Sequence, residues 1–141
     1  NRDFYTKTDP KSVETREKFV EYVTNMFKLL GDDAGAAQSN AATVMKIQTA
    51  LAEASLTPVE LRNPDNRYNK VTVDAAIAAM PDFSLAEYMS ARSVPKVPDM
   101  NFAQPKFFGA VNSMAKSVSL GDWKTYLRWM TVNAAAQFLP K

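Results

Sequence analysis

Apolar residues recur at helical spacing along most of this chain, and prolines separate the helix-like segments. The spacing predicts a first helix over 10–30. Asp9 is expected to cap it, and Gly31 to end it in left-handed backbone. A second, alanine-rich helix is predicted over 34–56. These two segments predict a helical fold.

The middle of the chain loses this periodicity. Residues 57–72 are irregular and contain the turn signal Asn63-Pro64-Asp65. Thr72 is predicted to cap a short helix that continues through Met80. Ser84 and Glu87 predict a capping box for another short helix, through about Ala91.

Helical spacing returns in the last third of the chain. Residues 94–102 contain two prolines, which allow extended chain and at most an edge strand. Pro105 begins a longer helix, and Ser119 caps the last one. The last helix carries the apolar stripe Trp123, Leu127, Met130 and Ala134, with Tyr126 and Trp129 beside it.

These elements predict an all-α fold. We expect a single helical domain over 1–141, with about four longer and two short helices around one core, an irregular loop and at most a short edge strand. The length of 141 residues suits one domain.

Composition removes several classes of chemistry. The chain has no Cys and no His, which excludes disulfides, cysteine nucleophiles, Ser-His-Asp triads and zinc sites built on imidazole or thiolate. The net charge is +2 with both signs interspersed, so nucleic acid is not an expected partner. No apolar run is long enough to insert into a membrane.

No motif in the sequence assembles an active site. The pair Asp32-Asp33 lacks the alternating oxygen ligands and central glycine of a calcium loop, so helix capping is the preferred interpretation. The oxygen donors of Asn63, Asp65, Asn66 and Asn69 are interleaved with Arg67 and Lys70, which favours turn formation. The residues themselves therefore predict no catalytic and no metal-binding residue.

Four segments, in order, resemble the neprilysin-type zinc metallopeptidases, especially their bacterial endopeptidase members. The segments are Arg2-Asp3-Phe4-Tyr5, Val44–Ala52, Arg62-Asn63-Pro64 with Tyr68-Asn69-Lys70-Val71-Thr72, and Trp123–Trp129. The chain departs from the family pattern at Gln48, where Glu is usual, and at Val71, where Met is usual.

The resemblance implies a role for the chain as part of a larger enzyme. In that family a catalytic domain binds zinc through an H-E-x-x-H helix, and a second, largely helical domain restricts entry to small peptides. The chain contains no H-E-x-x-H segment, so we expect a non-catalytic lid or substrate-access fragment of a zinc metalloendopeptidase. Zinc would belong to the parent enzyme, with no cofactor in this fragment. The absence of an initiator Met also favours a fragment.

The resemblance also implies partners and a location. Expected partners are the catalytic domain of the same parent chain and the parent's peptide substrates, with self-association in isolation. A periplasmic or cell-surface location is implied, and the lack of Cys favours a bacterial source. The alternative function is an independent helical protein-interaction module with no enzymatic role.

Two groups of residues are singled out as candidate sites. The family-signature loop contains Arg62, Pro64, Tyr68, Asn69 and Lys70. A structural role is favoured for it, with direct substrate contact as the alternative. We expect Tyr68 to pack between helices, so that Tyr68→Ala costs about 2–4 kcal/mol. The second group is predicted to pack against another domain: Trp123, Tyr126, Trp129 and Phe138.

Overall fold

The computed structural model describes residues 2–138 and confirms the predicted mainly helical fold. The chain divides into two compact units. We call Asp3–Ala50 with the residues from Val118 onward the long-helix unit, and Leu51–Ser117 the loop unit.

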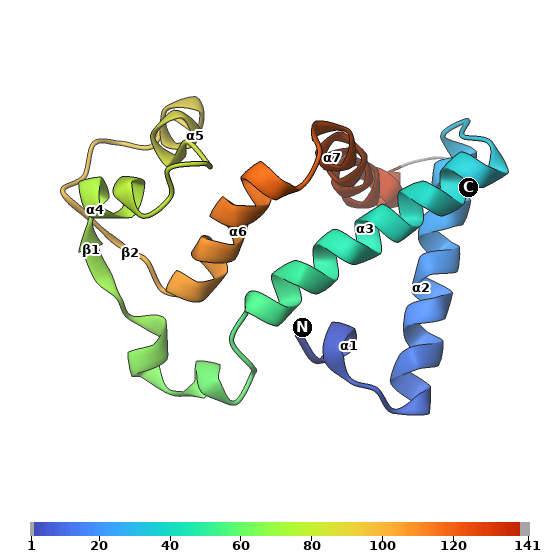
Figure 1. The fold of residues 1–141 in the computed structure, drawn as a ribbon, viewed down its shortest axis with the longest axis horizontal. Helices are drawn as coiled ribbons and strands as arrows, with labels where there is room; N and C mark the ends of the chain where they lie inside the picture. The colour runs from blue at the N-terminus through green and yellow to red at the C-terminus, as the bar shows by residue number, and fades with distance from the viewer. Residues whose placement is uncertain (1, 139–141) are drawn as a thin grey trace. The chain divides into compact units, whose positions relative to one another are not determined.

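The long-helix unit is built from three long helices and two short elements. They are α1 (Arg2–Thr6), α2 (Pro10–Leu29), α3 (Ala34–Ala54), α7 (Leu120–Ala135) and the 3₁₀ helix η3 (Ala136–Phe138) (Figure 1). The last turn of α3 lies within the loop unit.

The ends of α2 form as the sequence predicted. The side chain of Asp9 accepts a hydrogen bond from the Ser12 N–H at 3.0 Å, and Pro10 is the first helical residue. Gly31 has φ +93°, which L side chains rarely adopt. There the N–H groups of Gly31 and Asp32 donate to the carbonyls of Lys28 and Phe27, which is a Schellman motif.

Helix α1 was not predicted from the sequence. It is held to the long helices by the Arg16 Nη1 bond to the Phe4 carbonyl, at 2.9 Å, and by the Tyr5 hydroxyl, which donates to Gln48 Oε1 at 3.1 Å. Burial raises the pKa of the Tyr5 hydroxyl. A helix this short is not stable alone, so its stability comes from these tertiary contacts.

The core of the long-helix unit lies where α2, α3 and α7 meet. Its buried residues are Val23 and Phe27 from α2, Ala37, Ala41 and Val44 from α3, and Trp129 from α7. Phe19 and Tyr22 pack edge-to-face on the Trp129 ring, with centroid distances of 5.9 and 5.8 Å. The small α3 side chains leave room for the Trp129 indole.

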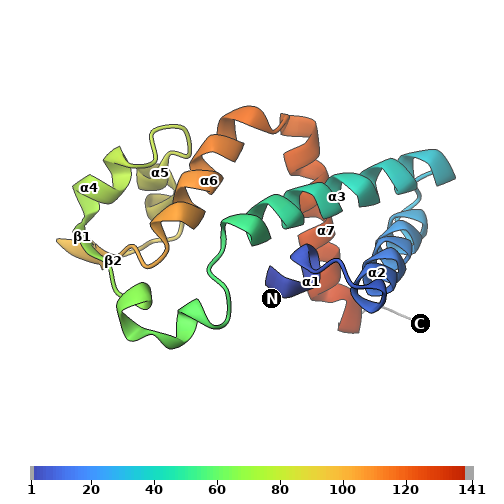
Figure 2. The ribbon, with the colours of Figure 1, turned by 60° about the horizontal axis from the view of Figure 1, so that its bottom comes forward.

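The loop unit contains short elements around a two-stranded sheet. They are η1 (Glu60–Arg62), η2 (Pro64–Arg67), β1 (Lys70–Thr72), α4 (Val73–Ala78), α5 (Leu85–Ala91), β2 (Asp99–Asn101) and α6 (Pro105–Ser117) (Figure 2). Strands β1 and β2 are antiparallel, with Val71 opposite Met100. The edge strand expected within 94–102 is therefore present, whereas its partner lies in a segment predicted to be irregular.

Capping in the loop unit differs from the prediction at one helix. Thr72 caps α4 as expected, accepting from the Ala75 N–H. Ser84 has left-handed backbone and makes no side-chain cap bond to α5, so the capping box predicted there is wrong. A capping box forms instead at Thr57 and Glu60: Glu60 Oε2 accepts from the Thr57 N–H, and Thr57 Oγ1 accepts from the Glu60 N–H.

The loop unit has a hydrophobic core of its own, made of Ala76, Met80, Leu85 and Phe102. The expectation of one core is therefore wrong, because the described residues form two separate buried clusters. The reason is local: the short helices of the loop unit bury their apolar faces against β2 and α6, which flank them in sequence.

Candidate functional site

The family-signature loop is an ordered structure, as expected. Asn63 Oδ1 accepts from the Asp65 N–H at 3.0 Å and begins η2. The Asn66 side chain donates to the Glu60 carbonyl at 2.9 Å, which ties the two 3₁₀ turns together. Hydrogen bonds from Thr57 lower the pKa of the Glu60 carboxyl.

Two asparagines, one in the loop and one in β2, hold the end of this loop to β2. The Asn69 side chain donates to the Phe102 carbonyl at 3.1 Å, and the Asn69 N–H donates to Asn101 Oδ1 at 2.9 Å. Asn101 Nδ2 in turn donates to the Arg67 carbonyl at 2.8 Å. The expectation that Asn side chains satisfy loop carbonyls is confirmed for Asn69. The role of Asn101 was missed, because only pairing of β1 with β2 places it there.

Lys70 forms an exposed ion pair across the same sheet. Its Nζ lies 2.9 Å from Asp99 Oδ2 on the partner strand. This hydrogen bond raises the pKa of the Lys70 ammonium. Exposed pairs contribute little to stability, so the contact mainly orients the side chain.

Tyr68 does not pack between helices. Its side chain is 67% exposed, so the predicted burial is wrong. Arg62 and Pro64 are exposed as well. The physical reason is that the asparagine hydrogen bonds order the loop without an aromatic anchor. Tyr68 lines an open cavity of about 310 Å³ together with Asn69, Gln104 and Lys106.

A matched pair of substitutions tests this division of roles. Asn69→Ala is expected to lower the free energy of unfolding by about 1–2 kcal/mol, because it leaves the Phe102 carbonyl without its donor. Tyr68→Ala is expected to change it by no more than about 0.5 kcal/mol, as for an exposed side chain. Urea unfolding of both variants measures the difference. Equal destabilisation by the two substitutions would contradict this assignment.

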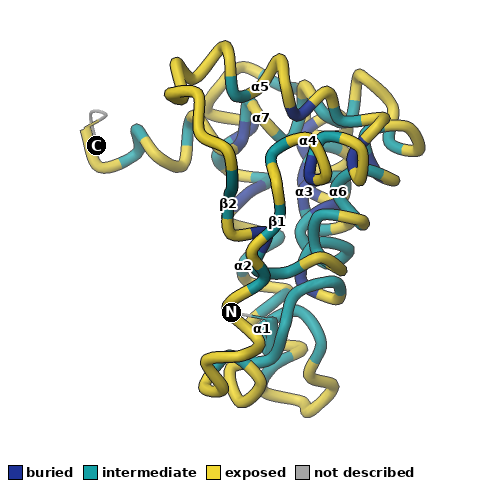
Figure 3. The backbone as a smooth tube through the Cα atoms, turned by 90° about the vertical axis from the view of Figure 1, so that its left-hand side faces the viewer, coloured by how far each residue is buried: buried dark blue, intermediate teal, exposed yellow. Residues whose placement is uncertain are grey.

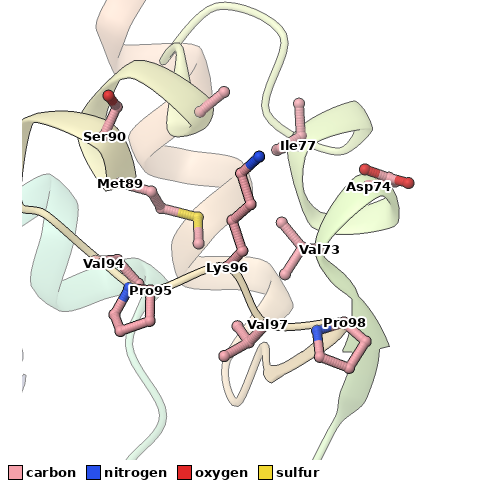
Figure 4. Close-up of a pocket in the computed structure, with 11 residues that line it drawn as sticks. Val73, Asp74, Ile77, Met89, Ser90, Val94, Pro95, Lys96, Val97 and Pro98 are labelled. Atoms are coloured by element: carbon pink, nitrogen blue, oxygen red, sulfur yellow. The ribbon is translucent and has the colours of Figure 1, made fainter.

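A second open cavity, of about 490 Å³, lies between α4, α5 and the segment before β2 (Figure 4). Its wall is mainly aliphatic, from Val73, Ile77, Met89 and Val97. Lys96 extends across it, and its ammonium has no ion-pair partner in the described part of the chain. Residues 92–98 are all exposed (Figure 3). The cavity can accept an apolar group beside the Lys96 cation, and its other polar lining side chains are Asp74 and Ser90.

Asp32 and Arg128 form the main polar contact of the long-helix unit. Arg128 Nη1 lies 2.9 Å from both Asp32 carboxylate oxygens, and the Asn40 side chain donates to Asp32 Oδ2 at 2.9 Å. The Arg128 guanidinium also lies over the Phe27 ring at 5.3 Å. Asp33 caps α3 by accepting from the Ala36 N–H. The predicted helix-capping role is thus confirmed for Asp33, whereas Asp32 forms an ion pair.

Stability of this contact is expected to depend on pH. The Arg128 hydrogen bond lowers the pKa of the Asp32 carboxyl. Its carboxylate therefore contributes stability above the unfolded value of about 3.9, and the contribution is lost as the pH falls through the lower folded value. Asp32→Asn should be less stable than the parent at neutral pH and should vary less with pH below about 4. Thermal unfolding of the parent and of Asp32→Asn, across this range of pH, measures how the stability of each depends on pH. Asp74→Asn, which removes an exposed carboxyl, is the control. Identical pH profiles for the parent and Asp32→Asn would be inconsistent with the pairing.

The four residues predicted to pack against another domain lie in different environments. Trp129 is only 2% exposed and belongs to the core of its own unit, so it is not available for that contact. Tyr126 is half-buried against the same core, and burial raises the pKa of its hydroxyl. Trp123 is half-buried and packs edge-to-face on Tyr126, whereas Phe138 is 80% exposed.

The described residues offer no site for zinc. Among residues 2–138 no three His, Cys, Asp or Glu side chains gather closely enough to hold a metal ion. No zinc-dependent step is therefore assigned to this part of the chain. None of its described helices is long and apolar enough to cross a membrane.

The fold of this chain is also found in solved structures of known proteins. Two solved structures of the zinc metalloprotease Zmp1 of Mycobacterium tuberculosis, one in an open state and one in complex with an inhibitor, each superpose with a TM-score of 0.92. Each is 22% identical to this chain and covers 100% of it, whereas the chain spans 22% of the Zmp1 chain. A comparison with curated protein sequences found no match.

The family follows from the sequence over its whole length. The profile of peptidase family M13 matches residues 1–141. This confirms the resemblance to neprilysin-type metallopeptidases. The chain belongs to peptidase family M13.

Proposed function

We propose that residues 1–141 are a non-catalytic part of a zinc metalloendopeptidase, in the helical region that limits access of peptides to the zinc site. The observation that carries the proposal is the family match over all 141 residues. It is combined with the finding that this chain superposes on only about a fifth of the Zmp1 chain. The absence of a metal-binding group in residues 2–138 agrees with a supporting role. The two units would then belong to one helical region of the larger enzyme.

The signature loop supports a division of labour within this role. Asn69 holds the loop to the end of β2 through its hydrogen bond to the Phe102 carbonyl, and the Lys70 side chain is oriented by its ion pair with Asp99. Tyr68 and Arg62 are exposed on the ordered loop and make no ion pair or hydrogen bond through their side chains in the described part. We assign these two side chains to contact with the peptide substrate or with the catalytic domain.

The remaining features of the parent enzyme follow from the family. Small peptides are the proposed substrates, zinc is the proposed metal of the catalytic domain, and the proposed location is outside the cytoplasm, in the periplasm or at the cell surface of a bacterium. No observation on this chain favours the alternative of an independent interaction module.

Zinc analysis and peptide hydrolysis test the proposal. The 141-residue chain is expected to retain no stoichiometric zinc after dialysis and to cleave no peptide, because it lacks His and Cys. The protein made from the complete reading frame should retain zinc and cleave short peptides faster than long ones. Equal cleavage of short and long substrates would contradict the access role. A complete protein without zinc would contradict the peptidase assignment.

A further inference from the structure

Helix α7 has a second apolar face, most of which its own unit leaves exposed. We call Leu120, Trp123, Leu127, Met130 and Ala134 the outer stripe. Leu120, Leu127 and Met130 are 70%, 59% and 43% exposed. Trp129, on the other side of the helix, fills the core. A helix that is apolar on opposite faces is typical of one packed between two layers.

The spacing of the outer stripe indicates which kind of secondary-structure element can pack against it. Its residues alternate in steps of three and four, which is the a/d pattern of a heptad repeat. Such a seam packs against another helix that lies nearly parallel or antiparallel to it. Ala134 lets that helix approach closely at one end of the seam. An extended peptide or a flat sheet would not match this repeat.

The residues beside the seam restrict the partner further. In the heptad, Lys124 and Thr131 lie on one side of the stripe, and Tyr126 and Asn133 on the other. Lys124 is exposed and has no ion pair in the described part of the chain, so a carboxylate on the covering helix would complement it. A second copy of α7 has no acidic residue at these flanking positions. Charge therefore favours a different helix over self-pairing.

We infer that the outer stripe is covered by an apolar helix of the same polypeptide, outside residues 1–141, with an Asp or Glu facing Lys124. This inference rests on the proposed function, since the occupant belongs to the larger enzyme. A superposable fold in Zmp1 occupies only 22% of that chain, which leaves most of such a polypeptide to supply the helix. Phe138, in η3 just beyond α7, is 80% exposed as well.

Thiol labelling tests the inference without using activity. The 141 residues contain no Cys, so Leu127→Cys adds one defined thiol to this region. The matched control is Glu21→Cys, at an exposed position of α2. Both variants are made in the protein from the complete reading frame, and their labelling by a maleimide is located by mass spectrometry in native buffer and in denaturant. Met130→Cys replaces Leu127→Cys if that variant does not fold.

The two thiols are expected to behave differently. Native labelling of Leu127→Cys should be at least about tenfold slower than that of Glu21→Cys, with equal rates in denaturant. Equal native rates would overturn the inference. Protection that disappears on dilution would also overturn it, because a second copy would then be the occupant. Protection in a protein without zinc or peptidase activity would support the helix contact and contradict only the proposed function.

Discussion

Replacing Trp129 with alanine is expected to lower the free energy of unfolding by about 3–5 kcal/mol, the range for a buried Trp or Phe. The side chain is 2% exposed and stands among Val23, Phe27 and the small residues of α3. Removing it leaves a cavity that rigid helix backbones cannot close, and it also removes the edge-to-face contacts with Phe19 and Tyr22. Urea unfolding of the 141-residue chain measures the change.

Leu127→Ala on the same helix is the matched control. Leu127 is 59% exposed, so its truncation in the 141-residue chain should change the free energy of unfolding by no more than about 0.5 kcal/mol. Both substitutions place Ala inside α7, and the helix propensities of Trp and Leu differ by much less than the expected effect of the cavity. A larger loss at Leu127 than at Trp129 would mean that the faces of α7 are assigned the wrong way round.

Phe102→Ala is expected to destabilise the loop unit by about 3–5 kcal/mol. Phe102 is 6% exposed and stacks on Phe108, with ring centroids 4.3 Å apart and planes 18° apart. Its N–H donates to the Asn69 carbonyl at 2.8 Å, so the residue joins the core to the signature loop. Loss of its ring should therefore loosen both the loop and the core of this unit.

Amide hydrogen exchange shows which parts of the protein Phe102→Ala destabilises. Protection is expected to fall across residues 70–114 and to persist in α2 and in α7, since the two hydrophobic cores are separate. Tyr68→Ala, which removes an exposed aromatic of the same unit, should leave the exchange pattern of the core unchanged. An equal loss of protection in α2 would show that the two units unfold as one.

Local signals in the sequence were sufficient for most helices and their ends. Asp9, Gly31, Thr72 and Ser119 act where they were expected to, because a cap or a left-handed stop needs only neighbouring backbone. The wrong prediction at Ser84 also rested on a local signal, the spacing of Ser84 and Glu87. The Thr57 and Glu60 pair has the same spacing and forms the capping box instead, so spacing alone could not rank the two sites.

Such local signals could not predict contacts between residues that are distant in the sequence. Strand β1 exists because β2 pairs with it, and Asn69 bonds to Phe102 and Asn101 across more than thirty residues of sequence. The pairing of Asp32 with Arg128 joins the end of α2 to α7 in the same way. Tyr68 was expected to anchor the loop, but these long-range hydrogen bonds order it and leave the ring exposed.

The sequence by itself determined the helical class, the places where most helices begin and end, and membership of a zinc-peptidase family without the zinc-binding residues. Only the tertiary structure decided that there are two cores, and which of the two apolar faces of α7 is buried. The physical reason is that periodicity reports how apolar positions repeat along a helix. Burial depends on which of two apolar faces finds a partner of matching shape: Trp129 packs in the core with the small side chains of α3, whereas Leu127 stays 59% exposed.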